Sequence, residues 1–183
     1  MPALALWAPE DGLLGALAPI ACAVAAGSAL VVDLDPSGPR YPGGRSLAEL
    51  VASDPTADDL RPGRGVAVLR NGGVAPGPAA AVVAALLDAW EHVVLRLPPR
   101  PAPASGAVPV VPVRLLLPEP WVTPTEDPAV YQATPTPGRM PGPGVRLPVP
   151  GRGTVDALLQ GRRPAPNRWI RAWQRVWEVP WTA

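Results

Sequence analysis

The stretch LWAPEDGLLGALAPIACAVAAGSALVVDLDPSG, residues 6–38, decides the fold class of this chain. It joins a short apolar segment, residues 4–7, to an alanine- and leucine-rich segment, residues 13–26, and then to the segment ALVVDL, residues 29–34. A segment that is apolar nearly all round predicts a buried helix, and a short, mostly apolar run that contains valines predicts a strand of a buried parallel sheet. The stretch therefore predicts a strand–helix–strand unit.

The same alternation continues along the chain. Ser46 and Glu49 have the spacing of a capping box, which predicts that a helix begins after Ser46. The next elements are expected in turn as a helix at residues 47–52, a strand at 66–70, a helix at 78–90 and a strand at 92–97. Such alternation predicts an α/β fold with a mostly parallel sheet and helices on both of its faces.

The later part of the chain is rich in proline, above all in the proline-rich segment, residues 98–144. This segment either presents polyproline stretches to a partner or forms a surface loop. A strand is expected at residues 108–117, and its prolines indicate either an edge strand or prolines at the start of the strand. Residues 118–144 are expected to form an extended loop. The remaining expected elements are a strand within 145–150, a helix capped by Thr154 that ends at Gly161, and a helix that begins after Asn167 and ends at about residue 179.

Length and composition narrow the class of protein. The 183 residues are expected to form one domain, residues 1–183, and the net charge of +1 gives no broad positive field, so no nucleic-acid partner is expected. Cys22 and His92 are the single cysteine and histidine, which excludes a disulfide framework and a Cys/His metal site. We interpret Cys22 as a small buried apolar residue and His92 as a structural residue, and a reducing, cytoplasmic setting is the natural inference.

Residues 12–32 carry no charge, a pattern that a membrane span or a signal peptide could also show. The preceding Glu10 and Asp11 are acidic where a signal peptide is basic, and Pro19 interrupts the run. These features favour a buried helix and strand of a soluble domain.

Five motifs follow one another along the chain: ALVVDLDPSG (residues 29–38), RSLAELVA (45–52), GVAVLRNGG (65–73), LLDAWEHVVLRLPP (86–99) and RLPVPGRGTVDALLQGRRP (146–164). In this order they resemble the MinD/ParA family of deviant-Walker P-loop ATPases, and within it the TadZ/CpaE branch associated with Tad (Flp-type) pili. The resemblance implies a truncated P-loop NTPase-like fold. It also implies a nucleotide pocket at Gly12, Gly15, Asp33 and Asp35.

The chemical groups of such a pocket are missing. A P-loop needs a lysine for the β- and γ-phosphates and a Ser/Thr hydroxyl for Mg²⁺, but the chain has no lysine, and Leu and Ala stand at these two places. Arg96 replaces the family's switch aspartate. We therefore expect a pseudo-ATPase with no catalytic residue, no metal and no cofactor, whose pocket is a vestige.

The resemblance then implies a protein-interaction or localisation factor for a larger assembly, such as a Tad pilus or a secretion system. Two alternatives stay open. One is a nucleotide-binding regulator or weak ATPase that uses the degraded pocket, and the other is a peripheral membrane protein anchored by its C-terminal helix. Family members often dimerise, which leaves a homodimer open as well.

The C-terminal Trp/Arg helix, residues 167–181, is the most unusual segment. Trp169, Trp173 and Trp177 recur every four residues, so their indoles are expected to form one stripe along the helix. Between them lie Arg168, Arg171 and Arg175. Three interpretations remain open: the stripe docks on the sheet, it binds a protein partner with the arginines, or it contacts a membrane interface.

Overall fold

The computed structural model describes residues 2–38, 40–100, 107–118, 124–136 and 138–182. Its strands are β1 (Ala3–Trp7), β2 (Ala29–Asp33), β3 (Val66–Leu69), β4 (Val93–Arg96), β5 (Val110–Leu116), β6 (Ala129–Ala133) and β7 (Gly144–Leu147). Its helices are α1 (Gly12–Ala26), α2 (Leu47–Ser53), α3 (Pro76–Ala89), α4 (Arg152–Leu159) and α5 (Arg168–Glu178).

The strands form one sheet in the order β3-β2-β4-β1-β5-β6-β7, and every pairing is parallel. This confirms the predicted α/β class, and the arrangement is consistent with a P-loop NTPase-like fold. All strands run in one direction, so the loops that follow their carboxyl ends meet at one edge of the sheet, where α/β proteins bind ligands.

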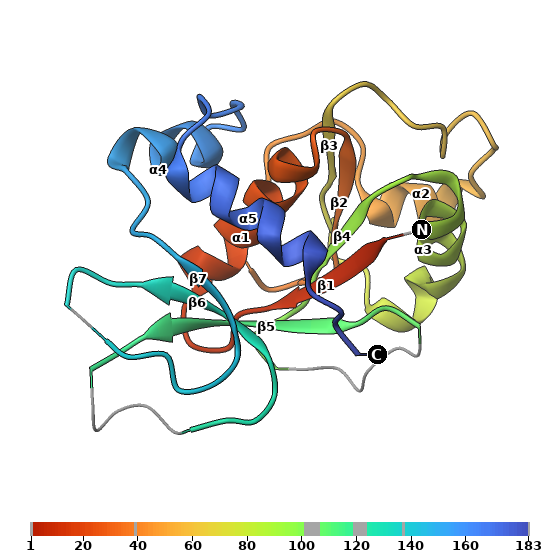
Figure 1. Cartoon of the computed structure of the whole chain (residues 1–183). Helices are drawn as coiled ribbons and strands as arrows, with labels where there is room; N and C mark the ends of the chain where they lie inside the picture. Colours follow the sequence, from red (N-terminus) through yellow and green to blue (C-terminus); the bar gives the residue numbers. More distant parts are fainter. Residues whose placement is uncertain (1, 39, 101–106, 119–123, 137, 183) are drawn as a thin grey trace.

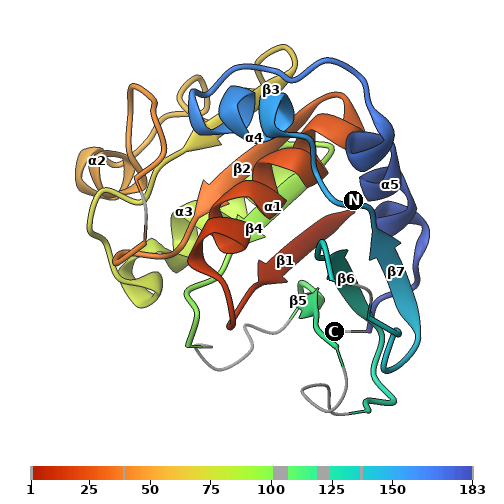
Figure 2. The same cartoon turned by 90° about the vertical axis from the view of Figure 1, so that its left-hand side faces the viewer.

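Helices cover both faces of the sheet, as predicted (Figure 1, Figure 2). Helices α1, α4 and α5 share one core with the sheet, and α2 and α3 share the other. On β5 and β6 the second face is covered differently, because Leu116, Ala129 and Tyr131 pack against Met140 from a loop. Within the described residues, no helix lies in that cluster.

Local signals located several element ends correctly. Ser46 and Glu49 form the predicted capping box at α2. The Asn167 side chain caps α5 by accepting hydrogen bonds from the backbone N–H groups of Trp169 and Ile170. Gly161, which adopts φ +65°, follows the end of α4 as expected.

Three predictions were wrong in detail. Of the two alternatives for residues 108–117, the edge position was wrong, because β5 lies between β1 and β6. The prolines lie at the start of the strand instead, since Pro109 precedes β5 and Pro112 is its third residue. The register between β5 and β6 begins at Val113, so the missing N–H of Pro112 removes no hydrogen bond from that pairing. Residues 118–144 are not one loop, because they contain the five-residue strand β6. The prolines before and after β6 made this part of the sequence resemble a loop.

The third correction concerns Thr154. Helix α4 begins at Arg152 with Gly151 as its N-cap, so Thr154 lies inside the first turn. The Thr154 hydroxyl oxygen instead accepts a hydrogen bond from the Asn167 side chain at 3.1 Å, which joins α4 to the start of α5.

Candidate functional site

The connection between β1 and α1 stands where a phosphate-binding loop would lie. It consists of only four residues, 8–11. Asp11 caps α1, because its carboxylate accepts a hydrogen bond from the backbone N–H of Leu14 at 2.8 Å. A helix N-terminus attracts an anion through its exposed N–H groups and its dipole. At α1, the chain's own carboxylate occupies this position.

The Glu10 side chain is bound by residues of β5. Its carboxylate forms an ion pair with Arg114 of β5 at 2.8 Å and accepts a hydrogen bond from the backbone N–H of Leu115 at 3.1 Å. The sequence placed negative charge in this loop, but it did not predict that Arg114 would neutralise it.

Gly12 and Gly15 are not needed for a close approach of backbone to ligand. A Cβ atom added to Gly12 would meet no heavy atom within 4 Å, and one added to Gly15 would lie 3.5 Å from the Ala8 side chain, an ordinary contact. The two glycines of the vestigial pocket therefore lack the crowding that requires glycine in a phosphate cradle.

Asp33 and Asp35 lie at the carboxyl end of β2, next to the end of β4, and the β2–β4 register pairs Asp33 with Arg96. The Arg96 guanidinium lies 2.9 Å from the Asp35 carboxylate and 3.3 Å from that of Asp33. All three side chains are almost completely buried, at 2–3% exposure. The two carboxylates of the vestigial pocket are thus partners of an internal arginine.

Neighbouring residues hold this ion-pair cluster in place. The guanidinium lies over the ring of Tyr41, 5.1 Å from its centroid, and the Tyr41 hydroxyl donates a hydrogen bond to the carbonyl oxygen of Ala16 in α1 at 2.7 Å. The Asp35 carboxylate also accepts hydrogen bonds from the backbone N–H groups of Ser37 and Gly38, each at 3.0 Å.

Gly38 has a steric role in the same cluster. A Cβ atom at this position would overlap both the Arg96 guanidinium and the Asp35 carboxylate. The glycine of the DLDPSG motif therefore leaves the space through which the arginine reaches Asp35.

One guanidinium faces two carboxylates in this cluster. Burial raises the pKa of Asp33 to about 6, although Arg96 acts in the opposite direction. Below about pH 6 the protonated form of Asp33 therefore predominates, which leaves a one-to-one pair between Arg96 and Asp35. The carboxylate oxygens that a magnesium ion would need are committed to this internal network.

A polar cavity of about 460 Å³ lies beside the cluster, at the carboxyl ends of β2 and β3. Asp33 and Asp35 contribute to its wall together with Arg40, Arg70 and Asn71. The Asn71 side chain donates hydrogen bonds to the carbonyl oxygens of Asp33 and Val74, both at 3.1 Å, and so ties the two strand ends together.

The C-terminal helix α5 docks its tryptophan face on the domain. Trp169 and Trp173 are 2% and 0% exposed, and the Trp169 indole N–H donates a hydrogen bond to the Gln132 side chain of β6 at 2.7 Å. The helix packs on α1 and β7. Of the three interpretations, the structure shows docking for these two indoles, which are therefore not exposed for contact with a partner or a membrane.

Trp177 is partly buried and reaches across to α1. Its indole N–H donates a hydrogen bond to the carbonyl oxygen of Cys22 at 3.0 Å, and its ring meets His92 edge-on at 5.2 Å. Cys22 itself is completely buried, and burial raises the pKa of its thiol. Cys22 is thus a small buried residue, as the sequence predicted, and His92 packs against Trp177.

The arginines of α5 lie on the opposite side of the helix from the buried indoles. Arg168, Arg171 and Arg175 are exposed, and together with Arg146 of β7 they line a shallow cavity of about 290 Å³. Sequence reasoning missed Arg146, because a single arginine in a short edge strand carries no signal of its own. Within the described residues, none of these four arginines forms an ion pair.

The polyproline hypothesis concerns residues 98–144, and part of that segment, residues 101–106, 119–123 and 137, lies outside the described residues. No model of a known protein family matches the chain, and neither does any curated protein. Among the described residues, no helix has the combined length and apolar character that crossing a membrane requires.

Proposed function

We propose that this protein is a pseudo-ATPase of MinD/ParA-like descent that binds other proteins instead of hydrolysing ATP. In this proposal it is a cytoplasmic interaction or localisation factor for a larger assembly, such as a Tad pilus or a secretion system. Its nucleotide pocket has become part of the folded core.

The observation that carries the proposal is the ion-pair cluster of Arg96 with Asp33 and Asp35. An ATPase of this class needs carboxylates that are free to organise Mg²⁺ and water. Here both face a buried guanidinium at 3.3 Å or less. Releasing them for a metal would separate the buried guanidinium from both carboxylates, which is costly.

The connection before α1 supports the same conclusion. The Asp11 carboxylate occupies the N-terminal end of α1, so the γ- and β-phosphates of ATP would meet a negative charge in place of a lysine. The chain has no lysine at all, so no other residue of that type can replace the missing one.

The direct test is titration of the full chain with Mg-ATP and Mg-ADP, followed by thermal unfolding and calorimetry. We expect no heat of binding and no change in the unfolding temperature. A ligand present at 100 times its Kd would stabilise the folded state by about 2.7 kcal/mol. A shift of that size would contradict the pseudo-ATPase proposal and favour the nucleotide-binding regulator.

For partner binding we propose the arginine face of α5, defined as Arg146, Arg168, Arg171 and Arg175. These cations are exposed and lack carboxylate partners among the described residues, so they suit an acidic protein surface. The peripheral-membrane alternative depended on exposed indoles. With Trp169 and Trp173 buried, anchoring to a membrane would depend on the arginines and the partly buried Trp177.

This surface can be tested once a partner is chosen from the neighbouring genes. If pilus-assembly genes adjoin this one, the pilus ATPase encoded there is the first partner to test. The triple variant R168E/R171E/R175E should weaken binding at least tenfold, since each lost surface ion pair costs about 0.5 kcal/mol. The control R61E/R64E reverses the charge of two exposed loop arginines and should bind normally.

Two results would count against this surface. Equal loss in the control variant would show that only the overall charge matters. Binding of the unchanged chain to anionic liposomes, lost in the triple variant, would favour membrane contact instead.

A further inference from the structure

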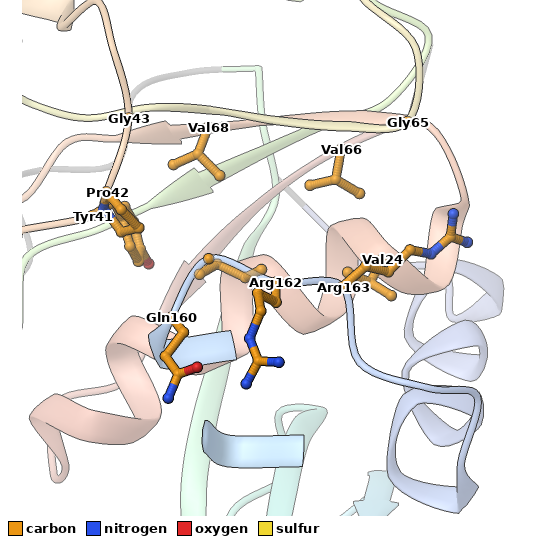
Figure 3. A pocket seen from close by; sticks show the side chains of 12 residues that line it. Val24, Tyr41, Pro42, Gly43, Gly65, Val66, Val68, Gln160, Arg162 and Arg163 are labelled. Atoms are coloured by element: carbon orange, nitrogen blue, oxygen red, sulfur yellow. The ribbon is translucent and has the colours of Figure 1, made fainter. Parts of the chain in front are cut away.

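Another cavity lies on the α1 side of the sheet, and neither Asp33 nor Asp35 is part of its lining. Its volume is about 500 Å³, and it is bounded by β3, α1, the loop after β2 and the turn between α4 and α5 (Figure 3). The apolar part of its lining consists of Ile20, Val24, Val66, Val68, Tyr41 and Pro42. The polar part comes from Gln160, Arg162 and Arg163.

The cavity exists because β3 is an edge strand of the sheet. Val66 and Val68 point from β3 toward α1 but are only partly buried against that core. The α4–α5 turn approaches from the other side and touches the loop after β2. A Cβ atom on Gly161 would lie only 2.9 Å from Pro42, so the turn packs closely at this point and leaves the space beyond it open.

The charge at the opening is positive. Arg162 and Arg163 are both exposed, and within the described residues neither is paired with a carboxylate. Figure 3 shows the Arg163 side chain running past Val24 toward Gly65, whereas Arg162 points away from the two valines. No acidic residue is part of the lining. The opening therefore combines an apolar interior with unpaired cationic groups.

We propose that this cavity binds a single-chain amphiphile with an anionic head group. The apolar chain lies between the valines of β3 and the α1 residues Ile20 and Val24, and the head group meets Arg163. The volume is within the range of small-molecule sites. A carboxylate and a phosphate share the chemistry that an arginine recognises. This site does not depend on the proposed function.

The test uses calorimetry of the full chain with octanoate, decanoate and dodecanoate, each below its micelle concentration. We expect saturable binding that tightens about fourfold for each added methylene, as burial of apolar surface predicts. Decanol, which has the same chain without the charge, should bind about fivefold more weakly, the effect of one partly exposed ion pair. Decyl phosphate compared with decanoate identifies the preferred head group.

Two variants test where the head group and the apolar chain of the ligand bind. R163A should reduce decanoate binding to the level of decanol and leave decanol binding unchanged, while the control R61A should have no effect on either. V66F fills the cavity from β3 and should weaken both ligands at least tenfold; circular dichroism checks that it is folded. A photoactivatable decanoate should label the unchanged chain within residues 20–24 or 66–68, which locates the site without any substitution.

Several outcomes would overturn the proposal. They are the absence of saturable binding, equal affinity for decanoate and decanol, full binding by a folded V66F, and labelling confined to other residues. If no saturable binding is found, the apolar lining would instead suit contact with a protein partner.

Discussion

Replacement of Arg96 by methionine tests most directly whether the ion-pair cluster is part of the core. The substitution keeps an unbranched side chain of similar length but removes the charge that faces Asp33 and Asp35. Breaking a buried pair by removing one partner costs about 3–5 kcal/mol, because the other charge stays buried without compensation. Since domains are typically stable by about 5–15 kcal/mol, R96M should lose a large share of its stability.

Urea unfolding followed by circular dichroism measures this loss. The control is R45M, which removes a surface ion pair with Asp59 and should cost less than about 1 kcal/mol. The triple variant R96M/D33N/D35N removes both carboxylates as well and should recover part of the loss, because no charge then remains buried in the cluster.

The loss in R96M should also shrink at acidic pH, where protonation neutralises the Asp33 carboxylate. A loss in R96M no larger than that in R45M would refute the reasoning. It would mean that the carboxylates reach water or another cation once the arginine is gone, and the pocket would then be available to a metal.

The remaining predictions concern the same cluster and the C-terminal helix. Because the pKa of Asp33 is raised to about 6 in the folded state, its contribution to stability is complete below its unfolded pKa of about 3.9 and is lost as the pH rises through 6. The difference in unfolding free energy between the wild type and D33N should therefore change by about 3 kcal/mol between about pH 4 and pH 8, and a constant difference would contradict the assignment. G38A should cost about 1–3 kcal/mol by overlap with Arg96, whereas G44A, which has open space, should stay within about 0.5 kcal/mol in the same urea titration. N167A removes the side-chain cap of α5 and should lower the unfolding free energy by about 1 kcal/mol; an unchanged midpoint would show that packing alone holds the start of this helix.

The helix caps, the class of fold and the missing phosphate-binding lysine could all be predicted from the sequence. The capping box at Ser46 and Glu49 and the cap at Asn167 could be predicted because each involves groups no more than three residues apart. The parallel sheet followed from alternation of strands and helices, since such a pattern leaves few ways to bury both faces of each strand. The absence of lysine, which removes the usual phosphate-binding side chain, was likewise plain from composition.

The same kind of evidence failed where proline hid a regular element. Strand β6 has only five residues, and prolines lie close to it on both sides, so its propensity signal was weaker than that of the loop around it. Only pairing with β5 and β7 makes it a strand. Propensity in strands depends on such neighbours more than on the segment itself.

Tertiary structure alone decided which groups of the site meet. Arg96 reaches Asp33 and Asp35 across more than 60 residues of chain, because β2 and β4 are neighbours in the sheet. The tryptophan stripe of α5 could be recognised in the sequence, but a four-residue repeat is the same whether its face is covered or exposed. In the folded chain, α1 and β7 cover the tryptophan face of α5, and the arginines of α5 stay exposed to solvent. Periodicity specifies the face of a helix, whereas the partner of that face depends on the rest of the folded chain.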